Sequence, residues 1–332
     1  MNTYQLSIKK VKKHSKQVGR FFWDNIILVS IPSILFSCLL FLSALSLLLQ
    51  KDLQDNKLYP FPFFISKPAA YPVLGVATSS ANVSEETFSI SAHSAVVMDD
   101  ASKVILFSKN PTFRFSMAST TKIMTALVAL SYYKENDILT IKNDQVPGTV
   151  VGFKNGEQYY FPDVLYALML PSGNDAAQAL ADNYLGGEDA FVAKMNEYSK
   201  DLYLLNTHYG DPAGLMDDDD YTTVVDLAHL ASFAIKNPIL AKVVATREKT
   251  INTVDFSRTL YFVNLNKLLG VNGVTGIKTG FTDEAKGVLV TAKKEENHTL
   301  ILVVMKSEDR FFDTMQLISL VSGKTIYQSM NR

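Results

Sequence analysis

One apolar run, Ile26–Leu49, constrains the folding of this chain more than any other feature. It contains 24 residues and no charge. A helix of this length, rising about 1.5 Å per residue, crosses a hydrocarbon core about 30 Å thick. Residues 1–25 carry a net charge of +5, whereas the flank after the run is balanced. Because positive flanks stay in the cytoplasm, the sequence predicts a cytoplasmic segment 1–25, a transmembrane anchor 26–49 and a body on the extracytoplasmic side of the cell membrane.

Two alternatives to a retained anchor are open at this point. Ala44-Leu45-Ser46 loosely matches the small-residue site at which a secretory signal peptide is cleaved. A lipoprotein signal through Cys38 fits less well, because Phe36 stands where such signals use a small residue. Cys38 is the only cysteine, so the body can form no intrachain disulfide.

Residues 50–86 are the predicted linker between the anchor and the body. Four prolines and the polar stretch 78–84 favour an extended tether. The aromatic stretch 59–65 is too apolar for a purely solvated spacer, so it is expected to rest on the membrane interface or on the body. The body, residues 87–332, is predicted to be the catalytic domain.

The charge of the chain excludes one class of partner. Residues 26–332 carry a net charge of −6, whereas a nucleic-acid-binding protein needs a basic patch against the phosphate backbone. The five histidines are scattered and lack the spacing of a helical zinc motif. We therefore expect no nucleic acid, no metal and no other cofactor.

Strand-like runs lie at both ends of the body, and helical patterns lie between them. The strands are predicted at 94–98, 103–107, 276–279, 288–292 and 300–305, with a hairpin formed by the first two. The helices are predicted at 120–132, 162–170, 175–184, 188–202, 223–234 and 312–327. This order predicts an α+β fold in which both ends of the domain build one antiparallel sheet beside a helical lobe.

The motif Ser119-Thr120-Thr121-Lys122 stands at the start of an apolar helical pattern. Residues three apart share a helix face, so the Lys122 amine can reach the Ser119 hydroxyl. A helix N-terminus also favours the negative oxygen that develops when a carbonyl is attacked. The pair is typical of a nucleophile and its base, although an N-cap serine beside a solvated lysine gives the same pattern.

Two further motifs supply polar partners for this pair. Lys122 can act as a base only when neutral, which requires burial or a nearby positive charge, and Lys278 is the candidate for that charge. Gly280, after the strand-like run that contains Lys278, leaves room for a substrate backbone. Ser172 and Asn174 lie between two helical patterns, where a hydroxyl can relay a proton and an amide can hold Lys122.

Each of these short motifs is weak alone, since residues 7–10 and 80–82 match two of the patterns as well. In this order, however, the three resemble the signature of penicillin-recognising serine peptidases. Over about 94–327 the chain is similar to the low-molecular-mass D-alanyl-D-alanine carboxypeptidases. The resemblance lies in residues 117–125, 172–177, 214–215, 223, 226–228, 264–269 and 273–282. It implies a β-lactamase-like, D,D-peptidase fold.

The resemblance also implies a reaction and a set of roles. Ser119 is implied to attack the bond between the two terminal D-alanines of a peptidoglycan stem peptide and to be acylated by β-lactams. By the same resemblance Lys122 is the general base, and Ser172 and Asn174 complete the proton relay and substrate cradle. The remaining implied contacts are Lys278 and Thr279 for the terminal carboxylate beside Gly280, the Ser119 and Phe281 amides for the oxyanion, and Arg310 as a second carboxylate contact.

Some details stay open. Relatives usually have Ala-Gly where this chain has Ala285-Lys286-Gly287, and Arg310 fits a surface helix start equally well. We expect the N-terminal span to replace the C-terminal anchor of many relatives. A D,D-endopeptidase that cuts crosslinks would use identical chemistry. A serine β-lactamase fits less well, because no deacylating glutamate motif follows Asn174, and a non-enzymatic envelope module would not need all these polar groups.

Overall fold

The computed structural model describes residues 71–74, 88–216 and 218–328. The chain divides into two units, residues 1–64 and 65–332, and every described residue belongs to the second. The predicted cytoplasmic segment and transmembrane anchor lie outside the described residues. In the part that is described, no single helix has the length and hydropathy of a membrane span, and α6 (Val224–Ala234) and α7 (Pro238–Val244) pass that test only as a pair bent by 111°.

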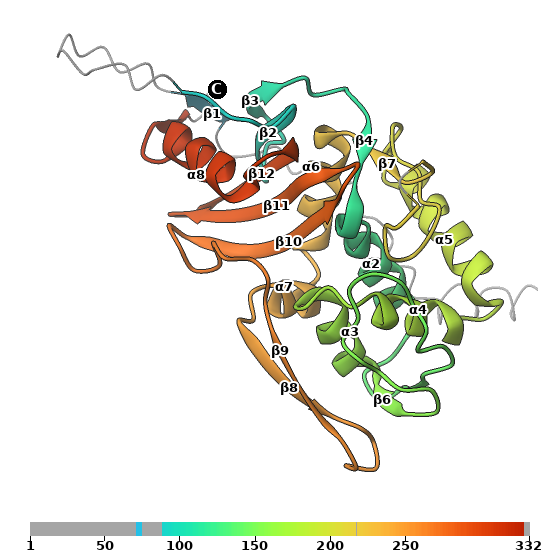
Figure 1. Ribbon diagram of the computed structural model, residues 1–332. Coiled ribbons are helices and arrows are strands. Elements are labelled where there is room, and N and C mark those ends of the chain that lie inside the picture. Colours follow the sequence, from blue (N-terminus) through green and yellow to red (C-terminus); the bar gives the residue numbers. More distant parts are fainter. Residues whose placement is uncertain (1–70, 75–87, 217, 329–332) are drawn as a thin grey trace, which may run out of the picture. The chain divides into compact units, whose positions relative to one another are not determined.

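An antiparallel sheet joins the two ends of the domain (Figure 1), as the sequence predicted. Among the described residues it has five strands in the order β10-β11-β12-β2-β3. Their bounds are β2 (Ser94–Asp99), β3 (Ile105–Lys109), β10 (Val274–Thr282), β11 (Lys286–Glu295) and β12 (His298–Ser307). Strand β12 pairs with β2 so that Val303 lies opposite Val96. The sheet therefore pairs strands that precede the helical segment with strands that follow it in the chain.

Both faces of this sheet are buried, because apolar side chains alternate between them along each strand. In β2, Val96 and Met98 join the large core that includes the helical lobe, whereas Ala95 and Val97 join a smaller core. The smaller core is completed by α8 (Arg310–Val321) through Leu317, Ile318 and Val321. Burying each such large apolar side chain stabilises the fold by about 1.5–3 kcal/mol.

The helical lobe follows the first hairpin, and its elements agree with the predicted helices to within about two residues. They are η1 (Ala118–Thr121), α2 (Lys122–Tyr132), α3 (Phe161–Met169), α4 (Asn174–Asn183) and α5 (Gly187–Asp201), with α6 after them. Helix α6 starts at an N-cap, Thr223, whose side chain accepts a hydrogen bond from the Asp226 amide.

Several short elements were not predicted. They are α7 and the paired strands β4 (Phe115–Ser116) with β7 (Tyr221–Thr222), β5 (Ile138–Thr140) with β6 (Gln158–Tyr160), and β8 (Glu248–Asn252) with β9 (Thr259–Val263). Strands β8 and β9 form a hairpin that extends from the lower end of the view in Figure 1.

The C-terminal helix is shorter than predicted. Helix α8 ends at Val321 and the chain turns through Gly323 at φ 68°, a left-handed conformation that suits glycine and ends helices. Residues 325–328 then form β13 (Thr325–Gln328), so the prediction of a helix to residue 327 is wrong beyond Val321. Strand β13 pairs with β1 (Tyr71–Leu74), which lies inside the predicted linker. This part of the linker is therefore attached to the domain.

Candidate active site

The turn that carries Ser119 lies directly against strand β10. Ser119 is in the short helix η1, and Ala118 before it has the left-handed φ of 45°. A Cβ atom added to Gly280 would lie 3.2 Å from the Ser119 backbone nitrogen and 3.2 Å from the Met117 carbonyl oxygen. The absence of a side chain at Gly280 thus allows the strand that bears Lys278 to approach the backbone of Ser119.

Lys122 is completely buried at the first residue of α2. Its Nζ lies 3.0 Å from Ser119 Oγ, 2.8 Å from Asn174 Oδ1 and 2.7 Å from the Ala213 carbonyl oxygen. Lys122 is therefore in direct contact with two other motif residues that the sequence indicated, Ser119 and Asn174, although Asn174 is 52 positions away in the chain.

Burial lowers the pKa of Lys122 to about 7, against the opposing effect of the carboxylates of Asp211, Asp220 and Asp175. Near neutral pH a large fraction of this amine is therefore unprotonated. The sequence predicted that such a lowering requires burial or a nearby positive charge, with Lys278 as the candidate for that charge. Burial is the cause in the structure, because desolvation is the largest effect on the Lys122 pKa and the charges that act on it are those of carboxylates.

The hydrogen-bond partners of Lys122 fix the direction of its lone pair. Asn174 Nδ2 donates to the Pro147 carbonyl oxygen at 2.7 Å, so Asn174 Oδ1 must face Lys122. Asn174 Oδ1 and the Ala213 oxygen can only accept hydrogen bonds. They therefore engage the two N–H bonds of a neutral amine. The remaining lone pair faces Ser119 Oγ, which then donates its hydrogen to Lys122.

Ser172 lies on a strained turn between α3 and α4, two residues before Asn174. Its φ is 68°, a region that residues with a side chain rarely adopt. Its hydroxyl is buried and has no hydrogen-bond partner within the described residues. A buried hydroxyl without a partner costs about 1–3 kcal/mol. The backbone strain and the unpaired buried hydroxyl both reduce stability, which is typical of a functional position.

Lys278 forms the other wall of the site, on β10. Its side chain is buried, and Nζ donates to the carbonyl oxygen of the adjacent Thr279 at 3.0 Å. Burial lowers its pKa well below the ordinary value, and the positive charges of Lys122 and Arg310 lower it further. The structure thus places the side chains of Lys122 and Arg310 within electrostatic reach of Lys278.

Arg310 starts α8 beside the end of β10. Its guanidinium carbon lies 5.9 Å from the centre of the Phe281 ring. A Cβ atom added to Gly287, which pairs with Phe281, would lie 3.2 Å from Arg310 Cβ. The inserted Lys286 adopts a left-handed φ of 52°, so the turn absorbs the extra residue and leaves Gly287 beside Arg310.

Sequence reasoning missed the groups that surround Lys122 from the helical side. These are the Ala213 carbonyl and the carboxylates of Asp175, Asp211 and Asp220. A signal for one of them was present, because Asp175 directly follows Asn174 and its carboxylate accepts the amides of Val151, Gly152 and Phe153. An acidic residue in the first turn of a helix is common, so the signal was not specific.

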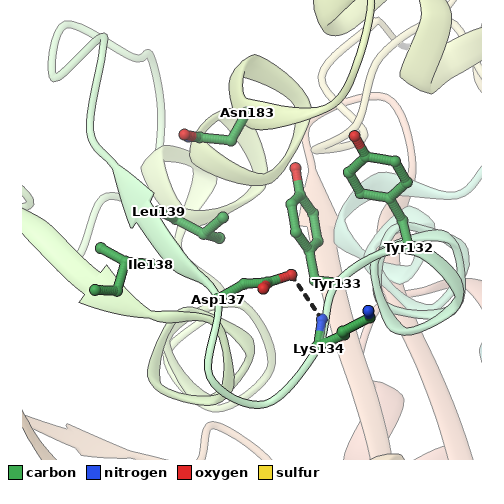
Figure 2. Close-up of a pocket in the computed structure, with 7 residues that line it drawn as sticks. All are labelled: Tyr132, Tyr133, Lys134, Asp137, Ile138, Leu139 and Asn183. Carbon is green, nitrogen blue, oxygen red and sulfur yellow. Dashed lines mark hydrogen bonds between the residues drawn. The ribbon is translucent and has the colours of Figure 1, made fainter.

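A pocket of about 420 Å³ lies away from these groups, beside the C-terminal end of α2 (Figure 2). It is lined by Tyr132, Tyr133, Lys134, Asp137, Ile138, Leu139 and Asn183. Two of its polar side chains bond to the protein backbone: Asp137 accepts the Lys134 amide, and Asn183 bonds the backbone of Thr140. It contains none of the motif residues. Across the described residues, no group of three or more His, Cys, Asp or Glu side chains is placed to hold a metal ion.

Comparison with known proteins gives a consistent set of matches. A family model described as D-alanyl-D-alanine carboxypeptidase, peptidase S11, matches residues 79–309. The D-alanyl-D-alanine carboxypeptidase DacF of Bacillus subtilis is 33% identical over 223 residues, which cover 64% of this chain and 57% of that protein. The chain thus spans little more than half the length of this relative.

Two further matches differ in the activity that they are named for. The D-alanyl-D-alanine endopeptidase of Pseudomonas aeruginosa is 33% identical over 228 residues, covering 67% of this chain and 73% of that protein. A crystal structure of the DD-transpeptidase of Streptomyces K15 is 35% identical with a TM-score of 0.67, covering 70% of this chain and 97% of the other.

Proposed function

Because the chain belongs to the D-alanyl-D-alanine carboxypeptidase family of serine peptidases, we propose that it removes the terminal D-alanine from peptidoglycan stem peptides. The observation that carries this proposal is the contact between Ser119 Oγ and the buried Nζ of Lys122 at 3.0 Å. With its other two contacts made to obligate acceptors, this amine is arranged to take the hydroxyl proton.

The first step is acylation. Lys122 takes the proton of Ser119 as Oγ attacks the carbonyl carbon of the penultimate D-alanine. The backbone N–H groups of Ser119 and Phe281 stabilise the resulting oxyanion. The bond to the terminal residue then breaks, and the proton passes from Lys122 through the hydroxyl of Ser172 to the leaving amine. This role explains why that hydroxyl is kept free of partners in the described protein.

The second step is hydrolysis of the acyl-enzyme. Lys122, again unprotonated, takes a proton from water, and the resulting hydroxide attacks the ester carbonyl. The bond to Ser119 Oγ breaks and Oγ recovers the proton from Lys122. A β-lactam would acylate Ser119 by the same first step, with its ring amide in place of the peptide bond.

Lys278, Thr279 and Arg310 bind the terminal carboxylate of the substrate in this proposal. The electrostatic support is that Arg310, a permanent cation, acts on the buried Lys278. An arriving carboxylate supplies a counter-charge and raises the pKa of Lys278.

Release of D-alanine from a peptide ending in Lys-D-Ala-D-Ala tests the proposal. The experiment uses the full chain in detergent, with Ser119→Ala as the control. We expect wild type to release D-alanine and the variant to release none. If folded wild type is acylated by a fluorescent penicillin but releases no D-alanine, the carboxypeptidase proposal fails. Cleavage of a crosslinked peptide dimer by the same sample would then identify an endopeptidase, the activity for which the Pseudomonas relative is named.

We further propose that residues 26–49 anchor the chain in the cytoplasmic membrane with the catalytic domain outside. The support is the length of the uncharged run and the +5 charge of residues 1–25. Digestion of intact spheroplasts by an added protease should remove the domain and leave a short membrane-bound fragment. Protection of the domain until the membrane is broken would contradict this orientation.

A further inference from the structure

We propose that Asp211 is a positioning residue for Lys122, and that Asp220 is the partner that holds Asp211 in place. The inference rests on the proposed function, because it concerns the base of that reaction. Neither residue belongs to the three motifs, and neither contacts Ser119 in the described hydrogen bonds. Their effect is exerted through the turn 211–216.

The carboxylate of Asp211 binds four consecutive backbone amides. Oδ1 accepts the amides of Ala213 and Gly214 at 2.6 and 2.7 Å. Oδ2 accepts those of Leu215 and Met216, both at 2.7 Å. The side chain of Asp211 is buried, so these bonds are protected from competing water. One carboxylate thus fixes the peptide planes of the whole turn.

Because the amides of the turn point toward Asp211, two of its carbonyls are free to face α2. The Pro212 oxygen accepts the hydroxyl of Thr125 at 2.6 Å, and the Ala213 oxygen accepts Lys122 Nζ at 2.7 Å. Lys122 and Thr125 are three residues apart and share one face of the helix. The turn therefore docks in register along the helix face that bears the base.

The same turn packs against the backbone beside Ser119. Gly214 has a φ of 81°, and a Cβ atom added to it would lie 2.1 Å from the Ala118 carbonyl oxygen. No side chain fits there without moving the turn. Through Gly214 and Ala213, the turn that Asp211 shapes is in contact with the backbone before the nucleophile and with the base.

Asp220 is fully buried beside Asp211 and completes the arrangement. Its Oδ1 accepts the Gly210 amide at 3.0 Å, whereas its buried Oδ2 has no hydrogen-bond partner among the described residues. Burial first, and then the charge of Asp211, raise the pKa of Asp220 to about 8. A protonated Oδ2 at neutral pH therefore supplies the hydrogen that Asp220 donates to Asp211 in this proposal, and Asp211 remains the acceptor for the four amides.

The test uses Asp211→Asn, with Asp218→Asn as a matched control of equal charge on an exposed residue of the same loop. An asparagine has one acceptor oxygen, and its NH2 group faces amides that also donate. We expect acylation by a fluorescent penicillin to fall about 100-fold, the effect of a misplaced catalytic group. Asp218→Asn should leave the rate unchanged.

Two readouts separate positioning from a merely structural role. The first is the pKa of Lys122, followed by NMR with ¹³C-labelled lysine. The titratable groups around it are Asp175, Asp211, Asp220 and Lys278. The negative charge of Asp211 stabilises the protonated form of Lys122. Without it the pKa of Lys122 should fall, and the rise of the acylation rate with pH should move to lower pH. The second is rescue, since Asp220→Asn keeps a donor to Asp211 and should retain far more of the rate than Asp220→Ala.

Folded Asp211→Asn with the wild-type acylation rate and an unchanged Lys122 pKa would overturn the proposal. If that variant does not fold, Thr125→Val removes only the hydroxyl bonded to Pro212, and a wild-type rate in it would equally overturn the proposal. The Lys122 pKa does not depend on substrate turnover. A wild type that releases no D-alanine therefore defeats the proposed function while the NMR comparison still decides the role of Asp211.

Discussion

The two walls of the site each bury a lysine, but they surround it with opposite charges. On the helical wall, the acidic side chains of Asp211, Asp220 and Asp175 act on Lys122, and two carbonyl oxygens accept its hydrogen bonds. On the strand wall, the permanent cation that acts on Lys278 is Arg310. The helical wall therefore supplies acceptors and negative charge before any substrate arrives, whereas the strand wall adds positive charge beside its lysine.

This difference separates a base from an anion site. A lysine whose donors are already matched to acceptors has a fixed lone pair and a pKa near the working pH, which suits proton transfer. A lysine held beside a permanent cation gains most from an arriving carboxylate, which suits recognition. The surroundings of the two lysines thus favour proton transfer for Lys122 and carboxylate binding for Lys278. Substitution of each lysine tests its role separately.

Lys122→Ala should produce the larger effect. Loss of the general base should lower the rate of penicillin acylation about 1000-fold, within the range for a positioned acid or base. The variant should stay folded, because buried apolar residues such as Ile123, Met124 and Leu127 hold α2 in the core. Stopped-flow labelling with circular dichroism measures both quantities.

Lys134→Ala is the matched control for that change, since this exposed lysine follows the opposite end of α2. It should acylate at the wild-type rate. A wild-type acylation rate in Lys122→Ala would show that Lys122 is not the general base. The assignment of different roles to the two lysines would then be wrong.

Lys278→Ala should have a smaller and more selective effect. A hydrogen bond to a charged group contributes about 1.5–3 kcal/mol, so KM for a peptide with a free terminal carboxylate should rise about 10- to 100-fold. The same peptide with an amidated terminus should be affected little. Steady-state kinetics on this pair of peptides, with exposed Lys294→Ala on β11 as the control, provides the measurement. Equal losses on both peptides would show that Lys278 does not recognise the carboxylate.

The sequence predicted the sheet and the helical lobe because both follow simple hydrophobic periods. Val96 and Val97, for example, alternate between two cores as the strand pattern requires. The sequence prediction failed where a single turn and a long-range strand pairing decide the structure. The ending of α8 at Val321 depends on Gly323 and on the pairing of β13 with β1, about 250 residues away in the chain.

For the site, too, the sequence indicated some residues and not others. Motif spacing indicated Ser119 and Lys122, and the order of the motifs indicated Asn174 and Lys278. Burial and a nearby positive charge were both expected as possible causes of a low Lys122 pKa, but the sequence could not decide between them, because burial depends on the packed lobe. The Ala213 carbonyl was also missed, since a backbone acceptor leaves no mark on residue type, and Asp211 acts only through the turn that it shapes.

The pH dependence of penicillin acylation in wild type tests the central claim, that neutral Lys122 is the base. Lys122 is protonated below its pKa of about 7 and then has no lone pair for Ser119. Single-turnover rates should therefore rise with pH through an apparent pKa near this value and fall about tenfold for each pH unit below it. A rate that stays flat between about pH 5 and 9, where a base of this pKa must titrate, would contradict the account.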